Sequence, residues 1–301
     1  MSSENKGMVS RRGLLAKSAA VTAMLASGAH GAGESRQKAG PATRRDRGRQ
    51  IGLQLFSVRS ECKRDLPGTM AAVAKMGYKG VEFAGYYGHA AKQLRKILDD
   101  NGLKCCGTHT GINTLVGDEL AKTIEFNETI GNKYLVVAGL PGKYRESHQA
   151  WLDTARLFNE IAEKVKPHGM FVGYHNMGYQ NNRIEFQVMD GELPWDTFYG
   201  NTRKEVIMQL DVGNAMRCGA DPLPYLYKYP GRAITVHLQE YSKTDPNALV
   251  GQGDVNWKAF FALCQAVGST EWYIVEYARG GAPRLESVEK CLKNLRRLRL
   301  V

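Results

Sequence analysis

Three side chains that can bind a metal ion each end a strand-like apolar run in the second half of the chain. These residues are Asp211, His237 and Glu276, and the runs that precede them are 206–210, 234–236 and 272–275. In a parallel barrel the carboxyl ends of the strands meet at one rim, so residues far apart in sequence converge there. Two carboxylates and one imidazole suit Mn²⁺, Mg²⁺ or Co²⁺, and suit Zn²⁺ less well. We predict a divalent metal site at this rim; the alternative is that the three residues only cap loops.

The elements that would position these residues alternate regularly from residue 51 onward. The expected strands are 51–55, 80–83, 103–109, 134–138, 170–175, 206–211, 234–237 and 272–276, with a turn at Gly213 after the sixth. The expected helices are 65–77, 89–101, 119–130, 147–168, 194–200, 222–229, 257–267 and 283–297. This alternation over about 250 residues predicts an α/β fold, the (β/α)8 TIM barrel. A doubly wound open sheet would need a glycine-rich turn after the first strand, and residues 54–59 contain no glycine.

The basic character of the chain is concentrated before this fold. Residues 1–50 hold ten Lys and Arg against three Asp and Glu, and so carry +7 of the net charge of +11. The high positive charge therefore does not indicate nucleic-acid binding. Residues 1–31 have the charged opening, the short apolar stretch and the small residues of an export signal, and Arg11-Arg12 followed by Gly-Leu-Leu-Ala-Lys resembles a twin-arginine signal.

We therefore expect three parts: a signal peptide over 1–31, a disordered linker over 32–49 and the barrel over 50–301. An ordinary secretory signal is the alternative to the twin-arginine type. The apolar stretch is too short for a stable membrane span, so the mature protein should have none and should be periplasmic or secreted. The six cysteines lack metal-binding CxxC spacing, and we interpret most of them as small core residues, although export permits disulfides.

Several motifs in the barrel region resemble one family in their order along the chain. They are Gly-Leu-Gln-Leu-Phe-Ser-Val-Arg at 52–59, Gly-Tyr-Lys-Gly-Val-Glu-Phe-Ala-Gly at 77–85, Gly-Tyr-His-Asn at 173–176, Leu-Asp-Val at 210–212, Val-His at 236–237 and Gly-Gln-Gly-Asp-Val-Asn-Trp at 251–257. Residues 50–300 thereby resemble the sugar phosphate isomerase/epimerase family of xylose isomerase-like TIM barrels. That family includes ketose 3-epimerases, hydroxypyruvate isomerases, inosose and 3-dehydroshikimate dehydratases, and lyases of 3-keto-glycosides. The resemblance implies a small sugar or keto sugar as substrate.

The resemblance also implies a metal held by strand-end Glu, Asp, His and Glu. Asp211, His237 and Glu276 match the last three positions. The first position differs, because strand five ends at His175 instead of a Glu that serves as ligand and base. His175 is the candidate for the fourth metal ligand or for a catalytic hydrogen bond to substrate, and Glu185 is a weaker candidate ligand.

The matched position of Glu276 serves as ligand and base in the family, so the resemblance makes Glu276 the general base. A bound metal would acidify a C–H next to a carbonyl or hydroxyl, and a carboxylate would take the proton. This chemistry predicts a sugar isomerase or epimerase. Without a second carboxylate on strand five, one-base chemistry is favoured, which includes elimination from a keto sugar such as a 3-keto-glycoside or an inosose.

Four more rim residues are candidates for substrate binding: His109, Asn214, Lys243 and Glu82. In related epimerases the positions of Asn214 and Lys243 contact sugar hydroxyls, whereas a solvated loop lysine is the alternative for Lys243. Glu82 ends strand two and could hold a hydroxyl, orient a ligand or form an ion pair below the rim.

Two other functional classes are weighed against the enzyme. The missing strand-five Glu leaves open a non-catalytic carbohydrate-binding barrel. A metal-dependent endonuclease is disfavoured, because it would need more ligands and a more basic mature chain. We expect no nucleic-acid partner, and a homo-oligomer stays open.

Overall fold

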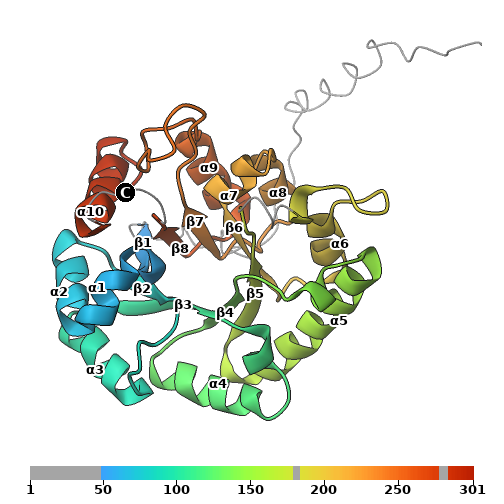
Figure 1. Ribbon diagram of the computed structural model, residues 1–301, viewed down its shortest axis with the longest axis horizontal. Helices are drawn as coiled ribbons and strands as arrows, with labels where there is room; N and C mark the ends of the chain where they lie inside the picture. The colour runs from blue at the N-terminus through green and yellow to red at the C-terminus, as the bar shows by residue number, and fades with distance from the viewer. Residues whose placement is uncertain (1–48, 179–183, 278–283) are drawn as a thin grey trace, which may run out of the picture. The chain divides into compact units, whose positions relative to one another are not determined.

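The eight strands close into one parallel barrel, in sequence order from β1 to β8. The structure is a computed structural model, and it describes residues 49–178, 184–277 and 284–301. The strands are β1 (Gln50–Gln54), β2 (Gly80–Phe83), β3 (Lys104–Thr110), β4 (Tyr134–Val137), β5 (Phe171–His175), β6 (Ile207–Asp211), β7 (Thr235–Leu238) and β8 (Trp272–Val275). Figure 1 shows them at the centre of a ring of helices. The predicted (β/α)8 barrel is confirmed.

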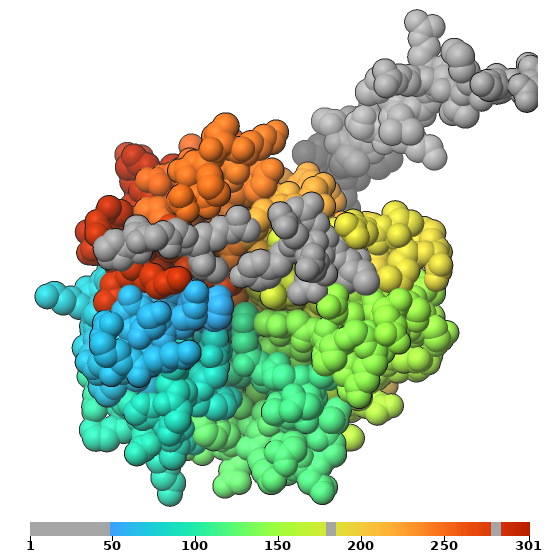
Figure 2. Space-filling model, in the orientation of Figure 1, coloured from blue at the N-terminus to red at the C-terminus, as the bar shows by residue number. Residues whose placement is uncertain are grey.

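The eight predicted helices are present with changes at their ends, and two short helices over residues 59–64 and 212–217 are additional. They are α1 (Arg59–Arg64), α2 (Leu66–Met76), α3 (Ala91–Asp100), α4 (Glu119–Thr129), α5 (His148–Val165), α6 (Pro194–Asn201), α7 (Val212–Arg217), α8 (Leu223–Lys228), α9 (Trp257–Leu263) and α10 (Arg284–Arg297). The segments follow one another around the face of the barrel in chain order, as the colours of Figure 2 show. The predicted signal and residues 32–48 of the predicted linker lie outside the described residues, as does Pro283. Arg49 donates a hydrogen bond to the Leu300 carbonyl.

Helix α7 was not predicted, and its cause is local. The sequence analysis places a turn at Gly213, but the chain continues from Asp211 directly into a helix. The Asp211 side chain accepts a hydrogen bond from the Asn214 backbone N–H and so caps that helix. A Cβ at Gly213 would lie 2.6 Å from the Gln239 carbonyl oxygen. Glycine is therefore needed here to let α7 pack closely against the end of β7.

The amino-terminal half of the barrel interior is apolar. Its buried side chains form a cluster separate from the main core: Cys106, Tyr134, Val136, Ile207, Trp272 and Ile274. Glycines on other strands leave room for two of them, because a Cβ at Gly80 would come within 2.8 Å of the Trp272 ring and one at Gly173 within 2.4 Å of the Ile207 side chain. This end of the barrel is a packed core and not a channel.

A β-bulge in β3 changes which of its side chains face the interior. The register against β2 shifts between Val81 and Glu82, which pair with Cys105 and Gly107. Cys106 belongs to the interior cluster, and His109, three residues later, also points into the barrel. Strict alternation would place two such residues on opposite faces. The extra residue of the bulge therefore brings His109 to the interior.

All six cysteines are free thiols, and only Cys218 is not fully buried. The interpretation of most of them as core residues is confirmed. Within the described ranges, no helix is both long and apolar enough to cross a membrane.

Candidate metal centre and active site

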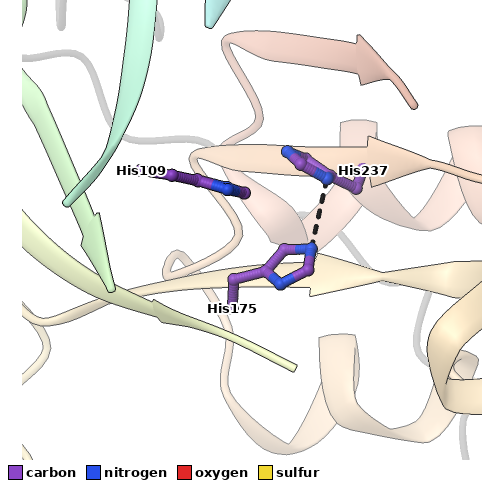
Figure 3. A group of neighbouring side chains, drawn as sticks. All are labelled: His109, His175 and His237. Atoms are coloured by element: carbon purple, nitrogen blue, oxygen red, sulfur yellow. Dashed lines mark hydrogen bonds between the residues drawn. The ribbon is translucent and has the colours of Figure 1, made fainter. Parts of the chain in front are cut away.

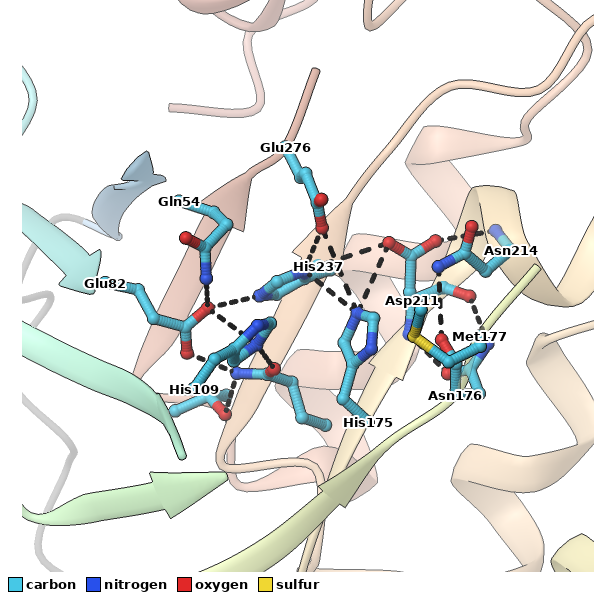
Figure 4. Close-up of polar contacts among 12 residues, drawn as sticks. Gln54, Glu82, His109, His175, Asn176, Met177, Asp211, Asn214, His237 and Glu276 are labelled. Carbon is cyan, nitrogen blue, oxygen red and sulfur yellow. Dashed lines mark hydrogen bonds and ion pairs between the residues drawn. The ribbon is translucent and has the colours of Figure 1, made fainter. Parts of the chain in front are cut away.

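Four side chains at the carboxyl ends of β5 to β8 converge inside the barrel. Each offers one ligand atom, and these atoms lie within 4.8 Å of one another: His175, Asp211, His237 and Glu276. The His237 Nδ1 atom lies 2.8 Å from Glu276 Oε2 and 3.2 Å from His175 Nε2. His175 Nε2 lies 3.6 Å from Asp211 Oδ2. Figure 4 shows the four side chains pointing toward a common space. The structure thus brings together His175 and the three residues predicted from the strand ends.

The donor set fits a single divalent cation. Ligands about 2.1 Å from a tetrahedral ion lie roughly 3.4 Å apart, and the separations above are close to this. Asp211 Oδ2 is buried and has no hydrogen-bond partner, although Oδ1 of the same carboxylate caps α7. A buried carboxylate oxygen without a partner is costly unless something positive binds it. Asp211 is therefore held with one oxygen free to bind a cation.

The environments of the two histidines in this cluster differ. Burial lowers the pKa of His175, so its ring is neutral and its Nε2 can donate a lone pair. Burial also disfavours a charged His237, but the carboxylates of Glu82 and Glu276 outweigh it and raise its pKa to about 10. A cation bound at His237 Nδ1 would replace the proton that bridges this nitrogen to Glu276.

Glu82 lies on the opposite side of His237 from the four-residue cluster. Its Oε2 atom lies 2.6 Å from His237 Nε2, and its side chain is fully buried. Burial raises the pKa of Glu82, but the charges of His109 and His237 outweigh it and hold that pKa well below its usual range. A carboxylate that fixes one nitrogen of an imidazole leaves the other aimed at a metal. Glu82 therefore orients His237 and lies outside the cluster itself.

Sequence analysis missed two glutamines that complete this network. Gln54 donates to Glu82 Oε2 at 2.6 Å, and Gln209 donates to Glu82 Oε1 at 2.7 Å. The side-chain Oε1 atom of Gln209 lies 2.8 Å from His109 Nε2. Gln54 ends β1, and Gln209 lies two residues before Asp211 on the same strand. The two-residue period of a strand places Gln209 on the inner face with Asp211, and that signal could have identified it.

His109 lies beside the two histidines of the cluster. The rings of His109 and His237 are stacked with centroids 5.2 Å apart, and those of His109 and His175 lie 5.0 Å apart. Figure 3 shows the three rings close together, with the His175 ring tilted against the other two. His109 is only partly buried, so it is placed next to the cluster with some access from outside.

The other predicted residues are not members of the four-residue cluster. Asn214 is buried and donates to the Asn176 carbonyl while accepting from Arg217, so it braces α7. Lys243 lies on an exposed loop, where its backbone N–H donates to Asp254. Glu185 accepts a hydrogen bond from the Tyr174 hydroxyl, and Tyr174 packs in the main core outside the barrel. The prediction of Glu185 as a fourth ligand is therefore wrong. Neighbouring residues of a strand point to opposite faces, so Tyr174 and the Glu185 bound to it lie on the outer side of β5, whereas His175 points inward.

The chain is similar to known proteins in sequence and in fold. The chain is 24% identical over 192 residues to an inosose dehydratase of Clostridium botulinum, which covers 57% of the chain and 62% of that relative. It is 22% identical over 264 residues to an inosose dehydratase of Clostridium tetani, covering 74% of the chain and 85% of that relative. A solved structure of a sugar phosphate isomerase/epimerase from Parabacteroides distasonis superposes with a TM-score of 0.71 at 24% identity, covering 82% of the chain and 98% of that structure.

The first of these relatives is matched over less than two thirds of its own length. The match to a family extends further, because the model of the xylose isomerase-like TIM barrel family covers residues 70–298. That range includes seven of the eight strands and all four residues of the cluster. The chain therefore belongs to the xylose isomerase-like TIM barrel family.

Proposed function

We propose that this protein is a divalent-metal-dependent enzyme that removes a proton next to a carbonyl or hydroxyl group of a sugar or keto sugar. The observation that carries the proposal is the convergence of four ligand atoms inside the barrel, with Asp211 Oδ2 buried and without a hydrogen-bond partner. Solved relatives described as sugar phosphate isomerase/epimerase and L-ribulose 3-epimerase support a sugar isomerase or epimerase.

Asp211, His237, Glu276 and His175 would hold the metal. The ion would supply Lewis-acid polarisation of a substrate oxygen, which acidifies the neighbouring C–H. Two carboxylates and two imidazoles favour Mn²⁺ or Co²⁺ over Mg²⁺, because imidazole suits transition metals. Glu82 keeps the His237 ring in the orientation that presents Nδ1 to the cluster.

Glu276 is the residue that takes the proton. Its side chain is 10% exposed, whereas those of Asp211 and His237 are completely buried. Burial raises the pKa of Glu276, but the hydrogen bond and charge of His237 outweigh it and lower this pKa to about 2. The carboxylate is thus ionised, as a general base must be, and it is the carboxylate of the cluster that a substrate can reach. His109, beside it and partly exposed, is placed to hydrogen-bond a sugar hydroxyl.

A dehydratase acting on a keto sugar or inosose is the second candidate. It is favoured by His175, because a neutral histidine at the end of β5 leaves the site with one carboxylate base. Elimination next to a carbonyl begins with the same proton removal as isomerisation. The two curated relatives carry the name inosose dehydratase.

Export is part of the proposal. Arg11-Arg12 and the apolar stretch after them support passage through a twin-arginine route, which carries folded proteins. A periplasmic or secreted enzyme would act on unphosphorylated sugars. Fractionation of cells that produce the full chain, with Arg11→Lys/Arg12→Lys as the variant, tests this: the wild type should leave the cytoplasm and the variant should remain there.

Metal analysis and proton exchange test the activity. Purified protein should hold one divalent ion per chain, and incubation with unphosphorylated ketoses, aldoses and inososes in D₂O should place deuterium at one carbon of a substrate. Asp211→Ala should lose both metal and exchange. His175→Ala should lose metal if His175 is a ligand, and should keep it with a raised KM if it only contacts substrate. Full exchange activity without bound metal would refute the proposal.

A further inference from the structure

A cavity of about 470 Å³ lies between α7, α8 and α9, outside the four-residue cluster. These helices neighbour one another in Figure 1. Its volume is within the range of small-molecule sites in proteins. Asp211 does not line it, but the next residue, Val212, does. A binding site here would therefore be a neighbour of the metal centre.

The packing of α7 separates this cavity from the barrel interior. Gly213 lies against the backbone of residues 239 and 240 so closely that a Cβ would be 2.6 Å and 2.8 Å from their carbonyl oxygens. Arg217 joins the same two segments by donating to the Glu240 carbonyl and to the Asn214 side chain. Val212 and Met216, one turn apart on α7, line the cavity instead. The cavity and the cluster thus lie on different sides of α7.

The chemistry of the lining suits a ligand with apolar and polar faces. Met216, Leu223 and Phe260 supply apolar surface. Lys243 and Asp254 add a cation and a carboxylate beside it. Asp221 and Asn256, which also line the cavity, each bind a backbone N–H with their Oδ1 atoms, at Leu223 and Ala259. Asp221 Oδ2 and Asn256 Nδ2 take no part in those two contacts.

The charges in the lining select against anions. Asp221 and Asp254 carry two negative charges against the single positive charge of Lys243. A phosphate group would meet net repulsion in this cavity. Hydroxyl groups, in contrast, can both donate to the carboxylates and accept from the lysine and the amide.

The loop that forms one wall is held in place before any ligand binds. Glu240 is buried and accepts hydrogen bonds from Gly251 N, Val255 N and the Trp257 indole N–H. The Asp254 carboxylate accepts from the Lys243 backbone N–H at 2.8 Å. A loop fixed in this way loses little conformational entropy on binding, which favours affinity.

We propose that this cavity is a second carbohydrate-binding site, for an uncharged pyranose, and that it binds independently of the metal centre. The apolar surface would pack against the C–H face of the ring, and the polar side chains would hydrogen-bond its hydroxyls. The site would hold a sugar next to the metal centre without taking part in its chemistry.

The test uses the Met216 methyl group as a reporter in the Glu276→Ala full-length chain, in which the metal centre is disabled and the Asp211 cap of α7 is kept. The probe is methyl β-D-glucopyranoside, and the Met216 signal is assigned from Met216→Leu. We expect the Met216 signal to shift in a saturable way, while that of the core residue Met70 does not. Ala220→Trp, which fills the cavity, should weaken this binding at least tenfold, whereas Ala121→Trp on the exposed side of α4 should leave it unchanged.

Two results would overturn the site. One is a Met216 signal that does not move during the titration, a result that needs no folded Ala220→Trp. The other is tighter binding of glucose 6-phosphate than of the neutral glycoside, which would refute the ligand class. Because the measurement is made without a working metal centre, neither result depends on whether the proposed enzyme activity is found.

Discussion

The two halves of the barrel interior are built by the same strands and do different work. On β8, Trp272 and Ile274 fill the amino-terminal half, and Glu276 follows two residues later in the metal cluster. On β6, Ile207 is apolar and buried, and Asp211 ends the same strand in the cluster. The strand period of two puts all of these residues on the inner face. Along β8, two residues, or roughly 7 Å, therefore separate Ile274 of the apolar cluster from Glu276 of the metal cluster.

The difference also shows in how polar atoms are satisfied. In the amino-terminal half, the Tyr134 hydroxyl donates to Glu271, and the other side chains of the interior cluster are apolar. In the carboxyl-terminal half, Glu82 is saturated with contacts whereas Asp211 Oδ2 has no hydrogen-bond partner. His175 Nδ1 is a second buried atom of the cluster without a hydrogen-bond partner. Such atoms mark where a ligand is missing, and in the described interior both lie at the carboxyl-terminal end.

The largest effect is expected from changing a carboxylate at each end of β8. Glu276→Gln keeps the shape of the side chain but removes its ability to accept a proton. We expect turnover to fall by a factor on the order of 10²–10⁴ with little change in the thermal midpoint of unfolding. The matched control is Glu271→Gln at the amino-terminal end, which should keep its turnover. Equal turnover in Glu276→Gln and wild type would remove Glu276 as the base.

A change in the apolar, amino-terminal half should affect stability and leave the chemistry unchanged. Trp272→Ala should lower the free energy of unfolding by about 3–5 kcal/mol, because it opens a cavity above Gly80 that the barrel cannot collapse to fill. Denaturant unfolding measures this loss. The folded fraction should retain its metal content and its turnover per molecule. A variant that stayed stable but lost its metal would show that the two halves are coupled.

The sequence was sufficient for the parts of this comparison that depend on one strand at a time. Asp211, His237 and Glu276 could be identified because each is a metal-capable residue at the end of an apolar run. His175 could be identified only by comparison with the family pattern, in which a Glu ends strand five. The barrel itself followed from the alternation of strands and helices.

What could not be predicted depends on contacts between strands. Orienting a ligand was one of the roles predicted for Glu82, but its partner was not predicted: Glu82 and His237 are 155 residues apart and meet only because the barrel closes. His109 faces the interior because of a bulge, and strand periodicity gives no sign of one. The helix after Asp211 was missed because Gly213 suggests a turn, whereas the cap and the close packing that require glycine there are visible only in the fold.

A smaller effect is expected for Glu82, which connects Gln54 and Gln209 to His237 of the cluster. Glu82→Gln preserves the size of the side chain but weakens its hold on His237 Nε2. Loss of such a supporting contact costs about 10–100-fold in metal affinity or activity. Metal affinity should be measured by competition with a chelator, and Gln54→Ala, which removes only one of the donors to Glu82, should have a weaker effect. An unchanged affinity with a raised KM would indicate that Glu82 holds substrate instead.

The smallest effect is expected outside the barrel interior, at Lys243. The resemblance to epimerases assigns this position to substrate, but here the residue lies on an exposed loop and lines the cavity beside α7. Its link to Asp254 is made by the backbone N–H, so Lys243→Ala keeps that contact. We expect a change in unfolding free energy within about 0.5 kcal/mol, full metal content, and kcat close to that of the wild type, while binding of methyl β-D-glucopyranoside at the cavity weakens. A tenfold or greater loss of kcat would instead show that Lys243 takes part in the reaction at the metal cluster. The active site would then include the loop that carries Lys243 as well as the carboxyl-terminal half of the barrel interior.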